Sequence, residues 1–229
     1  GVAQIAAAYQ QNTTLTILDV SGNCIGAQGA KHIAAALCQN ATVVSVDLSR
    51  NAFGDEGAAQ IAAALCKNST LTALTLSCNR IGAQGAAQIA VSLRQNASVT
   101  LLNLRYNAIR DEGAAQIAAA LLVNATLECL FLGDNEIGDR GAGDIASSFC
   151  DNTTLMSVDL SYNHIHEHGA ALIADAMCAS STVTDLDLGY NNIGPPGAEQ
   201  IATALQKNSS VTSLNLSCNC MGVLGAEEV

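Results

Sequence analysis

Three of the four histidines of the chain alternate within His164–His168, and alternating histidines can ligate zinc or copper. A second interpretation needs no metal. His166 replaces a glycine that recurs in equivalent loops of the chain, at Gly26, Gly82, Gly138 and Gly194. A solvated turn with neutral histidines explains this segment, and we favour it. We therefore expect neither a metal ion nor a cofactor.

The nine cysteines form no compact spacing pattern, and their odd number leaves at least one thiol without an internal partner. Such a set indicates free thiols in a reducing compartment, so we expect a cytoplasmic protein. Four cysteines lie at multiples of 28 residues from one another and are expected to be small buried hydrophobic residues: Cys38, Cys66, Cys150 and Cys178.

Catalytic motifs are absent from the sequence. It contains no phosphate-binding Walker loop, no nucleophile elbow, no His-Glu-x-x-His pair and no Ser/His/Asp set that a repeated unit would bring together. We therefore expect no catalytic residues and no enzymatic activity.

Charge and hydropathy exclude two classes of partner. The formal net charge is -11, so the phosphates of nucleic acid would be repelled. Residues 1–133 carry seven acids and seven bases, so the whole excess lies in residues 134–229. Mean hydropathy is +0.27, but no run of about 18 apolar residues could cross a membrane. We expect partners that are neither nucleic acid nor membrane.

A 28-residue repeat organises the chain. Asparagine recurs at this spacing eight times without an insertion, at Asn23, Asn51, Asn79, Asn107, Asn135, Asn163, Asn191 and Asn219. Glycine recurs with it, from Gly29 to Gly225, and should allow a close approach of helix to strand or an unusual backbone angle. The asparagine amides are expected to bond backbone groups inside the bend that follows each strand, and so to form a structural asparagine ladder.

Each repeat changes period midway. The alternating Leu-x-Leu pattern before each asparagine predicts a short strand. After the glycine, apolar residues at helical spacing predict a helix of about three turns, as in Ala30, Ile33, Ala34 and Leu37. A second asparagine column, which includes Asn12 and Asn40, should end the helices in the left-handed conformation.

The unit L-x-x-L-x-L-x-x-N-x-I-G-x-x-G-A-x-x-I-A-x-A-L resembles the leucine-rich repeat in its ribonuclease-inhibitor-like, 28-residue class. The resemblance covers essentially the whole chain. The repeated unit is similar to those in the repeat domains of NOD-like receptors and Ran GTPase-activating proteins. It implies an α/β fold, a right-handed horseshoe solenoid of about eight repeats. A parallel β-sheet would line the concave face and α-helices the convex face.

Residues 1–229 would then form one leucine-rich-repeat domain. Neither end carries a polar capping segment, so we interpret the chain as a piece of a longer array. The first predicted helix should expose Ile5 and Ala6 on its outer side. The protein is expected to be a monomer or to associate weakly end to end.

Positions that vary between repeats are free to carry recognition. On the predicted concave face they bring aromatic residues, typical anchors of protein interfaces, together with acids. The candidate partner-binding residues are Tyr106, Phe131, Asp134, Asp159, Tyr162, Asp185, Asp187 and Tyr190. A plain solvated sheet face would also accommodate them.

We expect a protein-protein interaction module, a receptor sensing domain or scaffold, whose acidic C-terminal half steers a basic or mixed partner. The alternative is a regulator of a small GTPase, as implied by the likeness to Ran GTPase-activating proteins. A third possibility is a structural array without a dedicated ligand.

Overall fold

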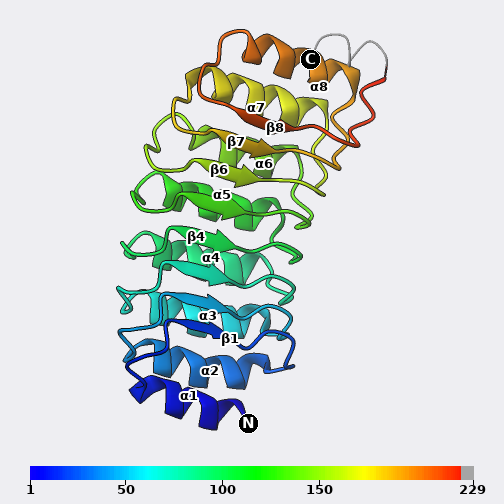
Figure 1. Ribbon diagram of the computed structural model, residues 1–229. Coiled ribbons are helices and arrows are strands. Elements are labelled where there is room, and N and C mark those ends of the chain that lie inside the picture. The colour runs from blue at the N-terminus through cyan, green and yellow to red at the C-terminus, as the bar shows by residue number, and fades with distance from the viewer. Residues whose placement is uncertain (223–229) are drawn as a thin grey trace.

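Helices and strands alternate along the whole of the described chain, residues 1–222 of the computed structural model (Figure 1). The helices are α1 Val2–Gln11, α2 Gly26–Leu37, α3 Gly54–Leu65, α4 Ala83–Leu93, α5 Arg110–Leu121, α6 Asp139–Ser147, α7 Glu167–Ala179 and α8 Gly194–Leu205. The strands are β1 Ile17–Asp19, β2 Ser45–Asp47, β3 Ala73–Thr75, β4 Leu101–Asn103, β5 Cys129–Phe131, β6 Ser157–Asp159, β7 Asp185–Asp187 and β8 Ser213–Asn215.

The strands form one parallel sheet in chain order, β1 to β8. Each residue pairs with the residue 28 positions later, as Leu18 pairs with Val46 and Leu74 with Leu102. The helices form a second layer on one side of this sheet (Figure 1). The predicted solenoid of eight coils, with strands on the concave wall and helices on the convex wall, is confirmed. No helix within residues 1–222 is long and apolar enough to cross a bilayer.

The core fills the space between the two layers with aliphatic side chains. The middle residue of most strands is buried, and so are the helix residues that face the sheet. The repeated glycine lets neighbouring helices approach. A Cβ atom on Gly57 would lie 2.6 Å from the Phe53 Cβ and 3.2 Å from the Ala30 Cβ of the preceding helix. The close approach that this glycine allows is therefore between neighbouring helices and not, as predicted, between helix and strand. No glycine of this column within residues 1–222 is left-handed, and Gly225 lies outside the described residues.

The asparagine ladder is confirmed. The side-chain amide of Asn79 donates to the carbonyl oxygens of Leu48 and Leu76 at 2.9 and 3.1 Å. Its oxygen accepts from the backbone N–H groups of Asn51 and Phe53 at 3.0 and 3.4 Å. Each ladder asparagine from Asn51 to Asn219 therefore bonds its own coil to the preceding one, whereas the Asn23 amide donates to carbonyl oxygens of its own coil. Buried backbone groups that lose such partners destabilise a fold by about 1–3 kcal/mol.

A second asparagine ladder joins the helix ends, and here the prediction was wrong. Asn12 is extended, with φ -73° and ψ 131°, and the column contains no left-handed residue. Instead, the amide of Asn96 donates to the carbonyl oxygens of Leu65 and Asn68 in the preceding coil, at 2.9 and 3.0 Å. These side chains are selected by bonds between coils and not by the local backbone angle.

Ser180 interrupts this second ladder. Its hydroxyl accepts one long bond, 3.4 Å from the Val183 N–H. The equivalent Asn208 accepts from two backbone N–H groups and donates to the Met177 carbonyl oxygen at 2.6 Å. The Phe149 carbonyl oxygen, which occupies the position of Met177 one coil earlier, receives no side-chain donor from residues 1–222. The second ladder therefore makes fewer hydrogen bonds at Ser180 than at the equivalent asparagines.

The loop before each helix adopts one of two conformations, and an aspartate of the preceding coil selects between them. Asp55 accepts hydrogen bonds from the N–H groups of Gly82 and Gly85 at 2.7 and 2.9 Å. Gly82 is then extended, with φ -94°. Asp111 and Asp139 act alike on the next coil and leave residues 138 and 166 extended.

Where the preceding coil has no aspartate at this position, the loop residue is left-handed. Gly54 follows a coil with Ala27 and has φ 59°, and Arg110 follows one with Ala83 and has φ 58°. Gly194 follows Glu167 and has φ 66°, so the longer acid does not substitute for aspartate. A left-handed arginine is unfavourable for an L residue, which shows how strongly the coil geometry imposes this alternative.

Two predictions of exposure were wrong. Cys66, Cys150 and Cys178 are exposed and Cys38 is partly exposed, because the residue after the buried helical position turns away from the sheet. On α1, Ile5 is exposed as predicted, whereas Ala6 is buried in the core cluster.

Candidate protein-binding surface

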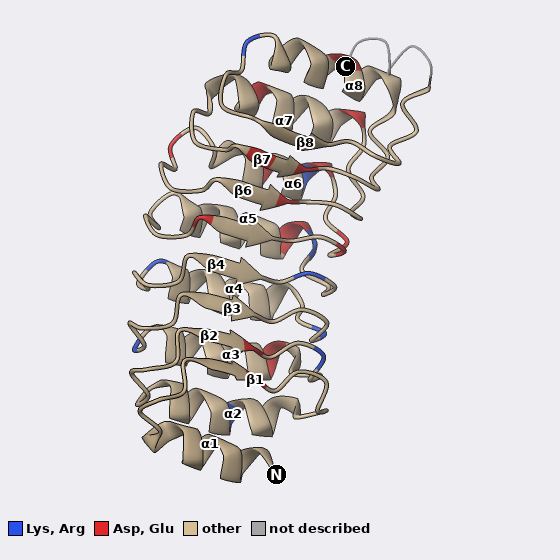
Figure 2. Ribbon diagram, in the orientation of Figure 1, with Lys and Arg blue, Asp and Glu red and all other residues tan. Residues whose placement is uncertain are grey.

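Of the eight predicted binding residues, four lie on strands β5 to β7 and four lie in the turns that follow β4 to β7, and we call the eight together the sheet-face patch. The register aligns Phe131 of β5 with Asp159 of β6, and Asp159 with Asp187 of β7. Asp185 lies two residues before Asp187 and so faces the same side. Acidic residues mark β6 and β7, whereas β3 and β4 carry none (Figure 2). The structure thus brings the four strand residues together.

The tyrosines of the patch lie where the chain leaves the strands. Tyr162 and Tyr190 stack with ring centroids 4.0 Å apart and an interplanar angle of 8°. Both backbones are left-handed, with φ 54° and 56°, and both side chains remain nearly half exposed. Hydrogen bonding with Tyr162 and Cys218 raises the pKa of Tyr190 to about 12. Tyr106 stands apart, because Asp134 occupies the intervening coil.

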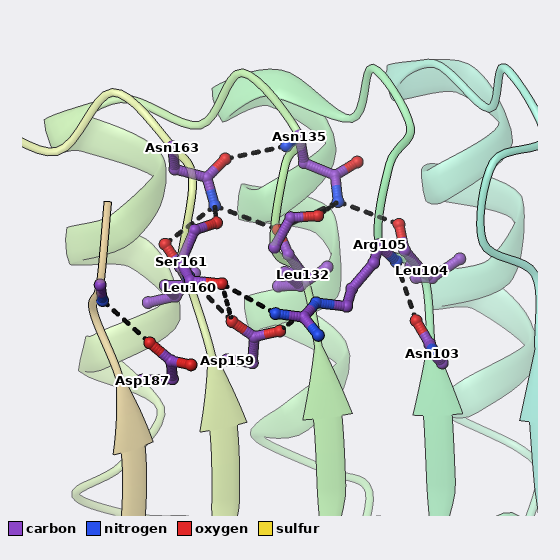
Figure 3. A network of polar contacts seen from close by, with 12 residues as sticks. Asn103, Leu104, Arg105, Leu132, Asn135, Asp159, Leu160, Ser161, Asn163 and Asp187 are labelled. Atoms are coloured by element: carbon purple, nitrogen blue, oxygen red, sulfur yellow. Dashed lines mark hydrogen bonds and ion pairs between the residues drawn. The ribbon is translucent and has the colours of Figure 1, made fainter. Parts of the chain in front are cut away.

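Asp159 differs from the prediction of an exposed acid, since it is only 5% exposed. One of its oxygens accepts from the backbone N–H and hydroxyl of Ser161, at 2.9 and 2.6 Å. The other lies 2.6 Å from the Arg105 Nε (Figure 3). Burial raises the pKa of Asp159, and the bonds from Ser161 and the Arg105 guanidinium oppose that rise.

Arg105 belongs to this surface, although the sequence did not single it out. It extends from the turn after β4 past β5 to Asp159 at the end of β6 and to Ser161, two residues further on, and its Nη2 donates to the Ser161 hydroxyl at 2.9 Å. It can cross because the intervening residue is Gly133. A Cβ atom there would lie 2.8 Å from Arg105 Nε and 3.0 Å from Asp159 Oδ2. The sequence did contain a signal for this contact. Arg105 is followed one repeat later by Gly133, at a position that is serine in most repeats.

A cavity of 220 Å³ opens on the sheet face beside this ion pair, and we call it the acid pocket. Its walls come from β5 to β8 and from Arg105. The lining residues are Arg105, Phe131, Ser157, Val158, Asp159, Asp185, Asp187, Ser213 and Asn215. Four of the eight predicted binding residues therefore share one concavity.

The alternating histidines lie outside the sheet-face patch, with His164 and His166 in the loop before α7 and His168 in the first turn of α7. His164, His166 and His168 are all exposed, and the His166 Nδ1 lies 3.9 Å from the Asp139 carboxylate. Within residues 1–222, no group of three His, Cys, Asp or Glu side chains is placed to hold a metal ion. The main contact of the segment is structural, since the His166 N–H donates to Asp139 at 2.6 Å.

Solved structures of other proteins share this fold. A structure of LegL7, a leucine-rich repeat-containing protein from Legionella pneumophila, is similar over 99% of this chain and 72% of that one, with TM-score 0.61 and 20% identity. The tropomodulin C-terminal domain of Caenorhabditis elegans is similar over 76% of this chain and 90% of that one, with TM-score 0.50 and 14% identity.

The structure of leiomodin-1 actin-binding site 2 is similar over 58% of this chain and 78% of that one, with TM-score 0.52 and 23% identity. No curated protein sequence matches the chain. The family model described as Leucine Rich repeat matches eight segments: residues 11–34, 39–62, 67–90, 95–118, 123–146, 151–174, 179–202 and 207–229. Because the family model matches most of the chain and the structure is a solenoid of eight coils, the chain belongs to the leucine-rich repeat family.

Proposed function

We propose that the chain is a protein-interaction module and that its partner docks on the sheet-face patch. The observation that carries this proposal is the coincidence of acids, aromatic rings and a cavity on β5 to β7, where the repeat requires none of them. The core and the asparagine ladders use other positions. A partner of basic or mixed charge would be steered by the excess acid of the C-terminal half.

The stacked tyrosines are suited to anchoring such a partner. Aromatic residues are enriched among the side chains that contribute most to protein interfaces. Tyr162 and Tyr190 hold each other in place while leaving nearly half of each side chain accessible. Little side-chain entropy would therefore be lost when a partner covers them.

The test compares capture of partners from a lysate by the wild type and by the Tyr162→Ala, Tyr190→Ala double variant. We expect the double variant to lose a partner that the wild type captures and to keep its thermal stability nearly unchanged. The matched control is Leu122→Ala, Val123→Ala, which removes exposed apolar side chains just after α5. Equal loss in both variants, or a collapse of stability in the tyrosine variant with normal binding by its folded fraction, would contradict the proposal.

Salt dependence separates steering from apolar anchoring. Ionic screening shortens to a few ångströms near 1 M salt, so we expect capture to weaken above about 0.5 M salt. Capture that does not change with salt would leave the tyrosine anchor in place and remove the electrostatic part of the proposal.

The alternative is a regulator of a small GTPase, which a net charge of -11 would also suit. We propose the binding module instead, because no catalytic contact of such regulators can be assigned to a residue of this chain. The two functions differ in one assay. A GTPase regulator would speed GTP hydrolysis by an added small GTPase, whereas a binding module would leave the rate unchanged.

A cytoplasmic site of action and a monomeric or weakly end-associating state form part of the same proposal. All nine cysteines lie in the described part of the chain as free thiols, which supports a reducing compartment. Likeness to leiomodin-1 actin-binding site 2 supports a protein partner in general, and at 23% identity it does not select actin.

A further inference from the structure

The acid pocket combines three carboxylates with one base. Asp159 is paired with Arg105, which leaves Asp185 and Asp187. Asp185 accepts from the Ser157 hydroxyl at 3.1 Å, and Asp187 accepts from the Gly189 N–H and the Asn215 amide at 2.9 Å. These donors are neutral. Within residues 1–222 neither carboxylate has a lysine or arginine partner, so the pocket keeps an uncompensated negative charge.

One guanidinium already occupies the rim of this pocket. Asp159 Oδ2 is buried and accepts no hydrogen bond of regular geometry from residues 1–222, so its contact is the guanidinium of Arg105 at 2.6 Å. Gly133 is what makes room for that group above β5. The surface therefore accepts a guanidinium at one carboxylate while two neighbouring carboxylates stay without a cation.

The size and walls of the pocket indicate what could fill it. At 220 Å³ it is smaller than the roughly 300–1,000 Å³ of sites for small molecules and cofactors, and it suits a single side chain. Phe131, on the strand next to Asp159, offers a ring on which a planar cation can stack. Asp185 and Asp187 offer carboxylates for paired N–H donors. Arginine satisfies both requirements better than lysine, since its guanidinium is planar and forked.

We propose that the acid pocket receives one arginine side chain of the partner and that Arg105 limits its affinity by holding Asp159. This inference rests on the proposed function, because it takes the sheet-face patch as the docking surface. The incoming guanidinium would pair with Asp185 and Asp187. Removing Arg105 would free a third carboxylate and strengthen binding.

The experiment titrates the full ¹⁵N-labelled chain with the peptide acetyl-Gly-Arg-Gly-amide. The amide resonances of Gly189 and Ser161 report on the pocket, because these N–H groups donate to Asp187 and Asp159. The control peptide carries citrulline, which has the same shape without the charge. We expect the arginine peptide to move both resonances and the citrulline peptide to bind at least about fivefold more weakly, as for loss of one partly exposed charge pair.

Variants of the protein give the second part of the test. Asp187→Asn and Asp185→Asn should each weaken arginine binding by about fivefold, and Arg105→Met should tighten it several-fold. Asp47→Asn is the matched control, since Asp47 holds the same column on β2 and accepts from Ser49 in the same way. The amide spectrum of each variant shows that it is folded.

Equal binding of the arginine and citrulline peptides would overturn the inference. So would equal effects of Asp187→Asn and Asp47→Asn, or weaker binding by Arg105→Met. These outcomes are distinct from failure of the proposed function. A protein partner that depends on the tyrosines but not on Asp185 or Asp187 would refute the arginine pocket alone. Arginine binding without any partner at the tyrosines would refute the proposed function alone.

Discussion

Replacing Ser180 with asparagine should stabilise the protein. The backbone at Ser180 has φ -75° and ψ 139°, within a few degrees of Asn12, which holds the same position in the first coil with φ -73° and ψ 131°. Asparagine can therefore enter without backbone strain. It would complete the ladder at the contact between the sixth and seventh coils, where Ser180 makes one long hydrogen bond to Val183.

The expected magnitude follows from the hydrogen bonds that Ser180→Asn adds. By analogy with Asn208, the new side chain would accept from the Thr182 N–H, shorten the bond to Val183, and donate to the Phe149 carbonyl oxygen. Net gains of about 0.5–1.5 kcal/mol per bond, less the cost of fixing a longer side chain, amount to about 1–2 kcal/mol. For a chain of this size, the melting temperature would rise by about 2–8 °C.

Urea unfolding followed by circular dichroism measures this change as a higher midpoint with an unchanged slope. Ser180→Asp is the matched control, because aspartate has the same shape and accepts the same N–H groups but cannot donate to Phe149. We expect the aspartate variant to fall below the asparagine variant. Equal stability of wild type and Ser180→Asn, or a less stable asparagine variant, would refute the view that the second ladder joins the coils through its amide donors.

Three further predictions concern single contacts. Asp55→Ala should lower the free energy of unfolding by about 1–2 kcal/mol and turn Gly82 left-handed, as its chemical shifts would report. Asp55→Glu should also leave Gly82 left-handed; an extended Gly82 in this variant would contradict the conclusion that only aspartate selects the extended loop. Burial raises the pKa of Asp159, so this residue contributes stability that is complete below about pH 4 and is lost as the pH rises through the native pKa. Relative to Asp159→Asn, the wild type should therefore gain stability as the pH falls from about 7 to about 4, and unfolding at a series of pH values checks the sign. Tyr162→Phe should lower the pKa of Tyr190 from about 12 toward its ordinary value, seen by ultraviolet absorbance titration, and an unchanged value would show that the hydrogen bond with Tyr162 does not cause the shift.

Contacts that repeat with the sequence were predictable from it. Because the ladder asparagines recur at 28 residues, their register and their partners in the bend followed from the spacing, as Asn79 shows. Contacts between positions that are not equivalent in the repeat were not predictable in this way. Arg105 reaches Ser161, which is 56 residues away and two coils distant. A comparison of equivalent positions does not reveal such a diagonal contact.

Two wrong predictions concern the helix ends, and each has its own physical cause. Asn12 and its equivalents were interpreted from the local backbone preference of asparagine, whereas their amides bond the neighbouring coil. The cysteine after each buried helical position was assigned to the core from its residue type. One residue turns a helix by about 100°, which carries Cys66 from the core side to solvent.

The most direct test of the proposed function is the dissociation constant of a captured partner for three forms of the chain. These are the wild type, a sheet-face variant with Tyr162→Ala and Tyr190→Ala, and a helix-end variant with Leu122→Ala and Val123→Ala. Loss of one or more aromatic anchors predicts binding at least about thirtyfold weaker in the sheet-face variant, equivalent to about 2 kcal/mol, and unchanged binding in the helix-end variant. Equal dissociation constants for the wild type and the sheet-face variant would contradict binding through this surface.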